Sequence, residues 1–299
     1  MTSLTLFTAP KPFTDPHIAL IQRNAVRSWT LLPETEVFLV GDETGIAETA
    51  QEMGVGHLGN VLRNPEGTPL VSSIFGLARE NGHGSLLAYV NADIILMPDF
   101  FETAILVAKT QPKFLLVGQR WDLEITRPLD FSTGWPQNLQ ESARSTGKLH
   151  KPVGSDYFIF PRVCYTEIPD FAVGRAGWDN WMIFKARKEG WKTIDATPSI
   201  MIIHQNHDYA HLPGGQIHHH LPESEQNKAM AGGKQVTRFT IKDATHEMKD
   251  GRLRSKPLTM ARFLRWLETA PLLYFGDARM TGRLSKVLRR AQRKGPTGR

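Results

Sequence analysis

A polar triplet, Asn91-Ala92-Asp93, closes the apolar run 85–90 and could hold a metal ion. Side chains alternate along a strand, so Asn91 and Asp93 are predicted to point the same way. Open α/β sheets bind ligands at the carboxyl ends of their strands, and two oxygen-bearing side chains there suit Mg²⁺ or Mn²⁺. Taken alone, however, the triplet favours a plainer role, in which both residues serve a turn and cap the next helix.

A second candidate site is the segment 177–181, where Trp178 and Trp181 flank Asp179 at a predicted loop-to-helix junction. Asp179 could cap the helix, or it could be a general base that deprotonates an acceptor hydroxyl. The two rings could stack on sugars. Apolar rings would also raise the pKa of the carboxyl group, which suits a base.

Histidines follow the apolar run 199–203. A neutral imidazole of His204 or His207 could complete the coordination of a metal held by Asp93. The alternative is a polar loop without function. The histidine run 218–220 is internal, and it predicts an exposed loop with adventitious metal binding rather than a dedicated site.

The elements that must position these residues alternate along the first two hundred residues. Apolar runs predict strands at 5–8, 36–40, 85–90, 114–117, 157–160 and 199–203. Helical spacing predicts helices at 16–29, 46–53, 70–79, 98–108 and 179–188, the first opened by Asp15 and Pro16. Residues 119–153 and 205–250 show little periodicity and are predicted to be loop-like, the former as a wall of the site. Near-continuous apolar strands with helices between them predict a mostly parallel sheet that helices cover on both faces.

The order of these features resembles the glycosyltransferase A (GT-A) fold over about residues 4–210. The resemblance implies a Rossmann-like, mostly parallel central sheet flanked by helices. It also implies an Asp-x-Asp-like motif that binds metal and the diphosphate of a nucleotide sugar, here Asn91 and Asp93. A later acid would lie near the acceptor, and a histidine, His204 or His207, would join the metal.

The segment Trp178-Asp179-Asn180-Trp181-Met182 is also similar to Trp-Asp-Asp-Trp-Met of N-acetylglucosaminyltransferase I. Two asparagines depart from the family pattern, Asn91 at the first acid of Asp-x-Asp and Asn180 at the acid that serves as base. Asp93 is therefore the dependable ligand, and Asp179 is expected to take the catalytic role. Asp156 is the second choice for that role.

The resemblance also implies positions for donor and acceptor. The expected nucleotide contacts are Thr8, Ala9, Pro10, Asp42, Arg63 and Ser73, together with Asn91 and Asp93. The expected sugar or acceptor contacts are Trp121, Gly154, Ser155, Trp178 and Trp181, with Trp135 as a further stacking candidate. Each of these residues could instead have an ordinary structural role in its loop.

Charge is concentrated at the end of the 299-residue chain, where residues 251–299 carry 13 Lys and Arg against two acids. This tail accounts for more than the whole net charge of +6. Apolar residues among its basic ones, in 257–294, predict two amphipathic helices around Pro271. Such helices suit an anionic membrane surface, although helices packed on the body with a solvated basic face are the alternative. Nucleic acid is not expected, because no stacking platform or binding motif accompanies the charge.

The remaining composition suggests where the protein works. One cysteine, Cys164, excludes an intrachain disulfide, and the first ten residues lack the pattern of a secretory signal. We therefore expect a cytoplasmic protein, peripheral at most on the inner face of the membrane. The predicted organisation is a GT-A-like domain over 1–250 and a basic amphipathic helical segment over 251–299.

Together these features predict a metal-dependent glycosyltransferase of the hexosyl or N-acetylhexosaminyl class. The expected donor is a nucleotide diphosphate sugar, first of all a UDP-sugar, with Mn²⁺ or Mg²⁺. The acceptor would be a hydroxyl of a carbohydrate or glycolipid, such as a lipid-linked or polysaccharide intermediate. A catalytically silent carbohydrate-binding or scaffold protein is the main alternative. A nucleotidyltransferase is less favoured, because the first strand is not followed by a glycine-rich loop.

Overall fold

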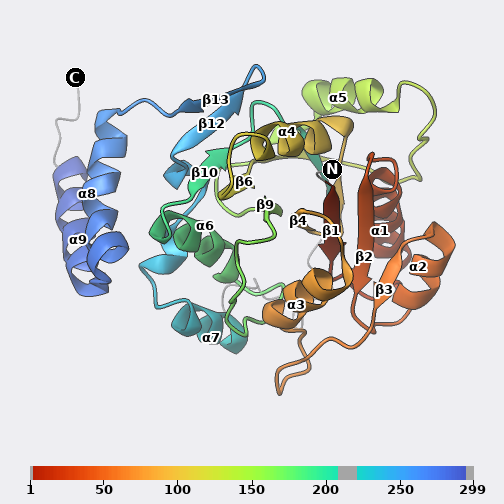
Figure 1. The fold of residues 1–299 in the computed structure, drawn as a ribbon, viewed down its shortest axis with the longest axis horizontal. Coiled ribbons are helices and arrows are strands. Elements are labelled where there is room, and N and C mark those ends of the chain that lie inside the picture. The colour runs from red at the N-terminus through yellow and green to blue at the C-terminus, as the bar shows by residue number, and fades with distance from the viewer. Residues whose placement is uncertain (1–2, 208–220, 294–299) are drawn as a thin grey trace.

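The computed structural model describes residues 3–207 and 221–293, which form a mixed α/β fold (Figure 1). In this part of the chain the main sheet has the strand order β13-β12-β10-β6-β9-β4-β1-β2-β3. Its strands are β1 (Leu4–Thr8), β2 (Thr35–Val40), β3 (Gly56–Leu58), β4 (Leu86–Val90), β6 (Phe114–Val117), β9 (Tyr157–Pro161), β10 (Lys192–Asp195), β12 (His246–Lys249) and β13 (Arg252–Ser255). Only β9 and β13 run antiparallel to their neighbours. The predicted mostly parallel α/β sheet is therefore confirmed.

Helices cover both faces of this sheet because the strands are apolar on both sides. Leu86, Ala88 and Val90 of β4 point into one core, while Leu87 and Tyr89 point into the other. The first core is closed by α1 (Pro16–Trp29), α2 (Ile46–Met53) and α4 (Pro98–Ala108). The second is closed by α3 (Val71–Asn81) and α6 (Trp178–Lys188). All five helices lie where the sequence predicts them, within two residues at each end.

A smaller sheet lies beside the carboxyl end of β4, and the prediction of a loop-like region at 119–153 is wrong there. This sheet has the order β5-β11-β7-β8, made of β5 (Ile94–Ile95), β11 (Ile202–Gln205), β7 (Arg120–Leu123) and β8 (Lys148–Leu149). Helix α5 (Trp135–Thr146) packs on it but buries only Leu139 and Ala143. Two buried residues leave almost no periodic signal in the sequence.

The prediction of loops over 205–250 is also wrong for its described part. Helix α7 (Pro222–Met230), two short 3-10 helices (Val236–Arg238 and Ile241–Asp243) and β12 occupy it. Strand β10 lies in a stretch with no prediction, and β11 begins at Ile202, three residues later than expected. The histidine run 218–220 lies outside the described residues.

The basic C-terminal segment is helical, as predicted, with α8 (Met260–Phe275) and α9 (Ala278–Arg293) side by side at one end of the long axis (Figure 1). Pro271 lies inside α8, which ends at Phe275 and is capped by Gly276, whose φ is +68°. A division of the chain at residue 250 would fall in the turn between β12 and β13, and it stays a prediction. Within the described residues, no helix combines the length and apolar character needed to cross a membrane.

Candidate active site

The triplet after β4 is brought to the strand-end histidines by the small sheet. The chain leaves β4 at Asn91, whose backbone N–H donates to the carbonyl of Asp156 at 2.9 Å. It then pairs β5 antiparallel with β11, so that Ile94 lies opposite His204. Residues more than a hundred positions apart therefore meet at the carboxyl edge of the main sheet, where α/β folds bind ligands.

Asp93, His204 and His207 form a compact group of possible metal ligands. One ligand atom from each lies within 4.8 Å of the others. Nε2 of His207 is 3.0 Å from Oδ2 of Asp93, and Nε2 of His204 is 3.6 Å from the same oxygen. The other oxygen of Asp93, Oδ1, is buried and finds no hydrogen-bond partner among the described residues.

The electrostatics of this group favour an ionised Asp93 carboxylate beside a neutral His204 imidazole. Burial alone would raise the pKa of Asp93, but the hydrogen bond with His207 and the nearby positive charges hold the pKa below its ordinary value. Burial lowers the pKa of His204, and the neighbouring Arg120 adds to this against the pull of Asp93. A neutral imidazole and a charged carboxylate are the forms that bind metal.

Behind His204 lies a carboxylate that the sequence analysis did not single out. Oδ1 of Asp122, on β7, is 3.2 Å from Nδ1 of His204. The same Asp122 is 2.8 Å from Nε of Arg120 and 2.7 Å from Nδ1 of His150. The contact follows from the parallel pairing of β7 with β11, which places Asp122 opposite His204.

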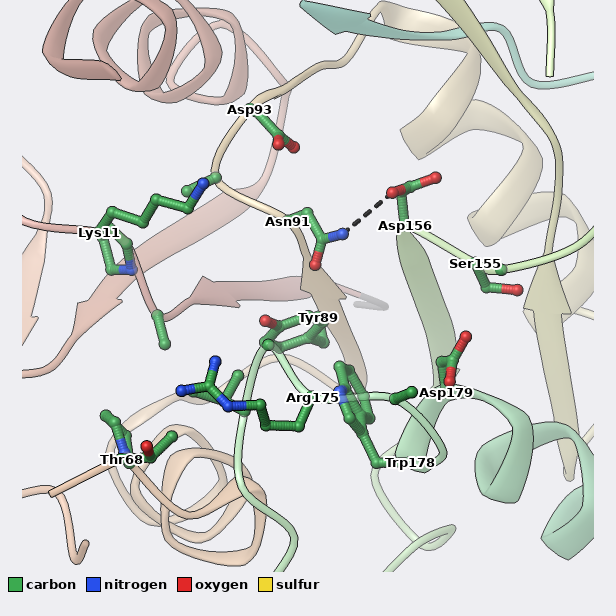
Figure 2. A pocket seen from close by; sticks show the side chains of 18 of the residues that line it. Lys11, Thr68, Tyr89, Asn91, Asp93, Ser155, Asp156, Arg175, Trp178 and Asp179 are labelled. Carbon is green, nitrogen blue, oxygen red and sulfur yellow. Dashed lines mark hydrogen bonds between the residues drawn. The ribbon is translucent and has the colours of Figure 1, made fainter. Parts of the chain in front are cut away.

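Asn91 has a local reason to be an amide rather than an acid. Its Nδ2 donates to Oδ1 of Asp156 at 3.0 Å (Figure 2). Nη1 of Arg120 donates to the same oxygen at 2.8 Å. An aspartate at position 91 could not donate this bond and would place a second negative charge against Asp156.

The candidate base, Asp179, lies in the first turn of α6. Gly177 precedes the helix with φ +114°, a left-handed backbone that favours glycine, and this brings Trp178 and Asp179 to the pocket. Burial raises the pKa of Asp179 above its ordinary value, although backbone N–H donors oppose the shift. Asn180 donates from Nδ2 to the carbonyl of Phe239 at 2.7 Å, a bond that a carboxylate could not make.

These residues line a pocket of about 960 Å³. Figure 2 shows Asn91, Asp93 and Asp156 along one side, with Lys11, Thr68 and Arg175 facing them from the other loops. The cationic residues of the lining are Lys11, Arg63, Arg120, Arg175 and Lys228. A pocket of this size, with possible metal ligands on one wall and cations around it, can accommodate a dinucleotide-sized anion.

The structure brings most of the predicted site residues to this pocket. Those that line it are Ala9, Pro10, Arg63, Asn91, Asp93, Gly154, Ser155, Asp156, Trp178, Asp179, His204 and His207. Those outside the lining are Thr8, Asp42, Ser73, Trp121, Trp135 and Trp181. Their predicted roles remain predictions, since no ligand contact tests them.

Several of the residues outside the lining have partners of their own. Trp181 is buried against Phe171, at a ring distance of 5.5 Å. Trp121 and Trp135 pack on the core of the small sheet. Asp42 forms an ion pair with Arg63.

Several pocket residues escaped the sequence analysis, namely Lys11, Glu43, Arg120, His150 and Arg175. Lys11 and Glu43 lie just after the first two strands, where α/β sheets bind ligands, so their position in the sequence could have indicated them. Arg175 is held in place by Glu223, whose Oε2 accepts from its Nε at 2.6 Å. That contact joins the loop before α6 to the first turn of α7, two segments that no sequence pattern connects.

No family model matches the sequence, and no curated protein has a matching sequence. Among solved structures, the chain is similar to a mannosyltransferase from Pyrobaculum calidifontis in complex with GDP-Man and Mn²⁺. Identity is 14%, the TM-score is 0.48, and the match covers 98% of this chain and 76% of that one. It is also similar to M. tuberculosis glucosyl-3-phosphoglycerate synthase, at 14% identity and TM-score 0.43, over 77% of each chain. That synthase has also been solved with Mg²⁺ and UDP. A likeness at this level of identity does not extend to substrates.

Proposed function

We propose that this chain is a metal-dependent glycosyltransferase that uses a nucleotide diphosphate sugar as donor. The observation that carries the proposal is the group Asp93, His204 and His207 at the strand edge, opening into a large pocket with a cationic lining. A UDP-sugar is the first donor to test. Solved structures of similar fold hold GDP-Man with Mn²⁺, and UDP with Mg²⁺.

The residues present fit a divalent ion. Asp93 supplies a buried carboxylate with one oxygen free of hydrogen bonds in the described structure, and the two histidines supply imidazole nitrogens. Mixed nitrogen and oxygen ligands suit Mn²⁺ better than Mg²⁺, which prefers oxygen and water. When bound, such an ion supplies positive charge to the diphosphate and to the leaving nucleotide. Asp122, behind His204, would orient that imidazole.

The donor would lie across the pocket from the first strand to α6. Ala9 and Pro10 follow β1, where they would contact the base, and Arg63 lies on the loop that enters the pocket before α3. Arg175 and Lys11 face the metal group across the cavity (Figure 2) and would hold phosphate oxygens. Gly154 and Ser155 would contact the donor sugar or the acceptor.

Asp179 would take the proton of the acceptor hydroxyl as that oxygen bonds to the donor sugar and the nucleotide diphosphate leaves. Its raised pKa makes it a better proton acceptor than an ordinary carboxylate. Oδ1 of Asp156, in contrast, already accepts hydrogen bonds from both Arg120 and Asn91. We therefore assign the base to Asp179 and a positioning role to Asp156.

The acceptor would be a carbohydrate or glycolipid hydroxyl, as in a lipid-linked or polysaccharide intermediate. Trp178 lines the pocket beside Asp179, so its ring would contact an acceptor sugar. The ring is already held edge-on by Tyr89, at 5.1 Å between centroids. A preset ring loses little entropy when a sugar stacks on it.

The experiment is a thermal-shift panel of nucleotides and nucleotide sugars, with Mn²⁺ or with EDTA. A ligand that binds the folded state raises the melting temperature by mass action. We expect one nucleotide diphosphate sugar to do so only with Mn²⁺, and the shift to vanish in Asp93→Ala but persist in Glu80→Ala, an exposed acid on α3.

Turnover then separates the alternatives. The glycosyltransferase assignment requires Mn²⁺-dependent release of nucleotide from the same donor, which Asp179→Asn abolishes. Binding without any turnover would replace it with the silent carbohydrate-binding protein. A folded protein that binds no member of the panel would remove both the donor and the metal assignments.

A further inference from the structure

One side of helix α8 is apolar and exposed. Met260, Phe263, Trp266 and Tyr274 are 71%, 39%, 43% and 65% exposed. Their spacing places them within one third of the helix circumference, because residues three, four, seven and eleven apart share a face. The rings of Phe263 and Trp266 stack at 6.1 Å. Among the described residues, nothing covers this face.

The opposite side of α8 explains why the helix is there. Leu272 and Leu273 are buried in the core that α6 closes, and Thr269 is buried beside them. Helix α9 packs along α8, and both stand at one end of the long axis (Figure 1). The helix is therefore held in place by its buried side and by α9, and its exposed aromatic side chains are not needed for this packing.

Basic side chains are exposed on α9, the helix that packs along α8. Arg279, Arg283 and Lys286 of α9 are exposed and recur at helical spacing. The acids of the segment do not offset them in full. Glu268 lies 3.1 Å from Arg238 and 2.9 Å from Arg265, and Asp277 accepts from a backbone N–H of α9. Between residues 252 and 286 there are eight Lys and Arg against these two acids.

We propose that the exposed side of α8, with the basic side of α9, docks on an anionic lipid bilayer. Trp and Tyr are the side chains that prefer the boundary between headgroups and acyl chains, and Met and Phe add apolar area there. The exposed arginine and lysine side chains of the neighbouring helix α9 are attracted to anionic headgroups. A second copy of the chain fits less well, because a symmetric interface would bring like-charged α9 helices together.

The test is flotation of the full-length protein with vesicles of phosphatidylcholine alone or mixed with phosphatidylglycerol, without nucleotide sugar. We expect binding only to the mixed vesicles and a marked loss at high salt, since surface charge is screened there. Because no donor is present, failure of this proposal and failure of the glycosyltransferase assignment are distinguishable.

Two double variants separate the aromatic and charge contributions. Trp266→Ser with Tyr274→Ser should weaken vesicle binding at least about tenfold. Arg279→Glu with Arg283→Glu should weaken it about 30-fold or more. The matched controls are Val163→Ser and Arg27→Glu with Lys109→Glu, which change exposed residues outside α8 and α9. These controls should bind like the parent protein, and every variant should melt within a few degrees of it.

Three results would overturn the proposal. The first is equal binding to vesicles with and without phosphatidylglycerol, and the second is unchanged binding in both double variants. The third is a dimer, seen by light scattering, that the aromatic variant dissociates while vesicles are not bound. If the protein bound duplex RNA and not vesicles, the proposal would also be overturned, and the basic surface would be a nucleic-acid-binding site.

Discussion

Replacing Asp122 tests whether the site is built to hold a metal. Asp122→Asn keeps the shape of the side chain but removes the charge that lies 3.2 Å from Nδ1 of His204. A neutral His204 that presents Nε2 to Asp93 and a metal carries its proton on Nδ1. Within the described residues Nδ1 makes no hydrogen bond, so we predict that the carboxylate 3.2 Å away accepts this N–H when a metal binds, and then sets both tautomer and ring orientation. Such supporting carboxylates contribute about 10- to 100-fold in metal affinity, equivalent to about 1.4–2.7 kcal/mol.

The assay is Mn²⁺ binding to the purified protein, followed by the loss of the free-ion signal in electron paramagnetic resonance. We expect the Kd for Mn²⁺ to rise about 10- to 100-fold in Asp122→Asn, and binding to be lost in Asp93→Ala. His150→Gln is the matched control, because it removes a different partner of Asp122 and leaves both Arg120 and His204 in place. It should change the Kd by less than about threefold.

A purely structural role for Asp122 would give a different pattern. The melting temperature without metal would fall, while the Mn²⁺ affinity of the remaining folded protein would stay within about threefold of the parent. That result would refute the reasoning, and so would an equal loss of affinity in His150→Gln. In either case Asp122 would act through general packing and not through His204.

Three further predictions concern carboxyl groups. Asp179→Asn should lower kcat by about 10²- to 10⁴-fold with donor affinity unchanged. In the parent protein, kcat should decline as pH falls through the raised pKa of this group; a flat profile would exclude it as base. Asn91→Asp should lower the free energy of unfolding, measured in urea at pH 7, by about 1–2 kcal/mol. The loss should be smaller in acid, where the added carboxylate is neutralised. Asp99 has its pKa raised by burial to about 6, so the folded state holds a proton that the unfolded state has lost and stability falls as pH rises from about 4 to 6. Asp99→Asn should therefore raise the free energy of unfolding at pH 7 by about 2 kcal/mol but not at pH 3, and parallel pH curves for the two proteins would contradict this.

The ends of many helices and strands are set by neighbouring residues, so the sequence alone located them. Asp15 caps α1 by accepting from the N–H of Ile18 at 2.9 Å, as its place before Pro16 indicates. Helices that bury a wide apolar side were likewise predictable. Helix α5 was not, because Leu139 and Ala143 alone give too weak a pattern.

The candidate site divides in the same way. Asp93, His204 and His207 each lie within four residues after the end of an apolar run, so the sequence could nominate them one by one. Their meeting depends on the pairing of β5 with β11. Asp122 and Arg120 lie inside a strand and carry no such mark. The sequence by itself therefore determined which residues could do chemistry, through strand ends, caps and composition. The tertiary structure alone decided which of them share a site and which carboxylate supports His204, because strand register is set by contacts between segments far apart in the chain.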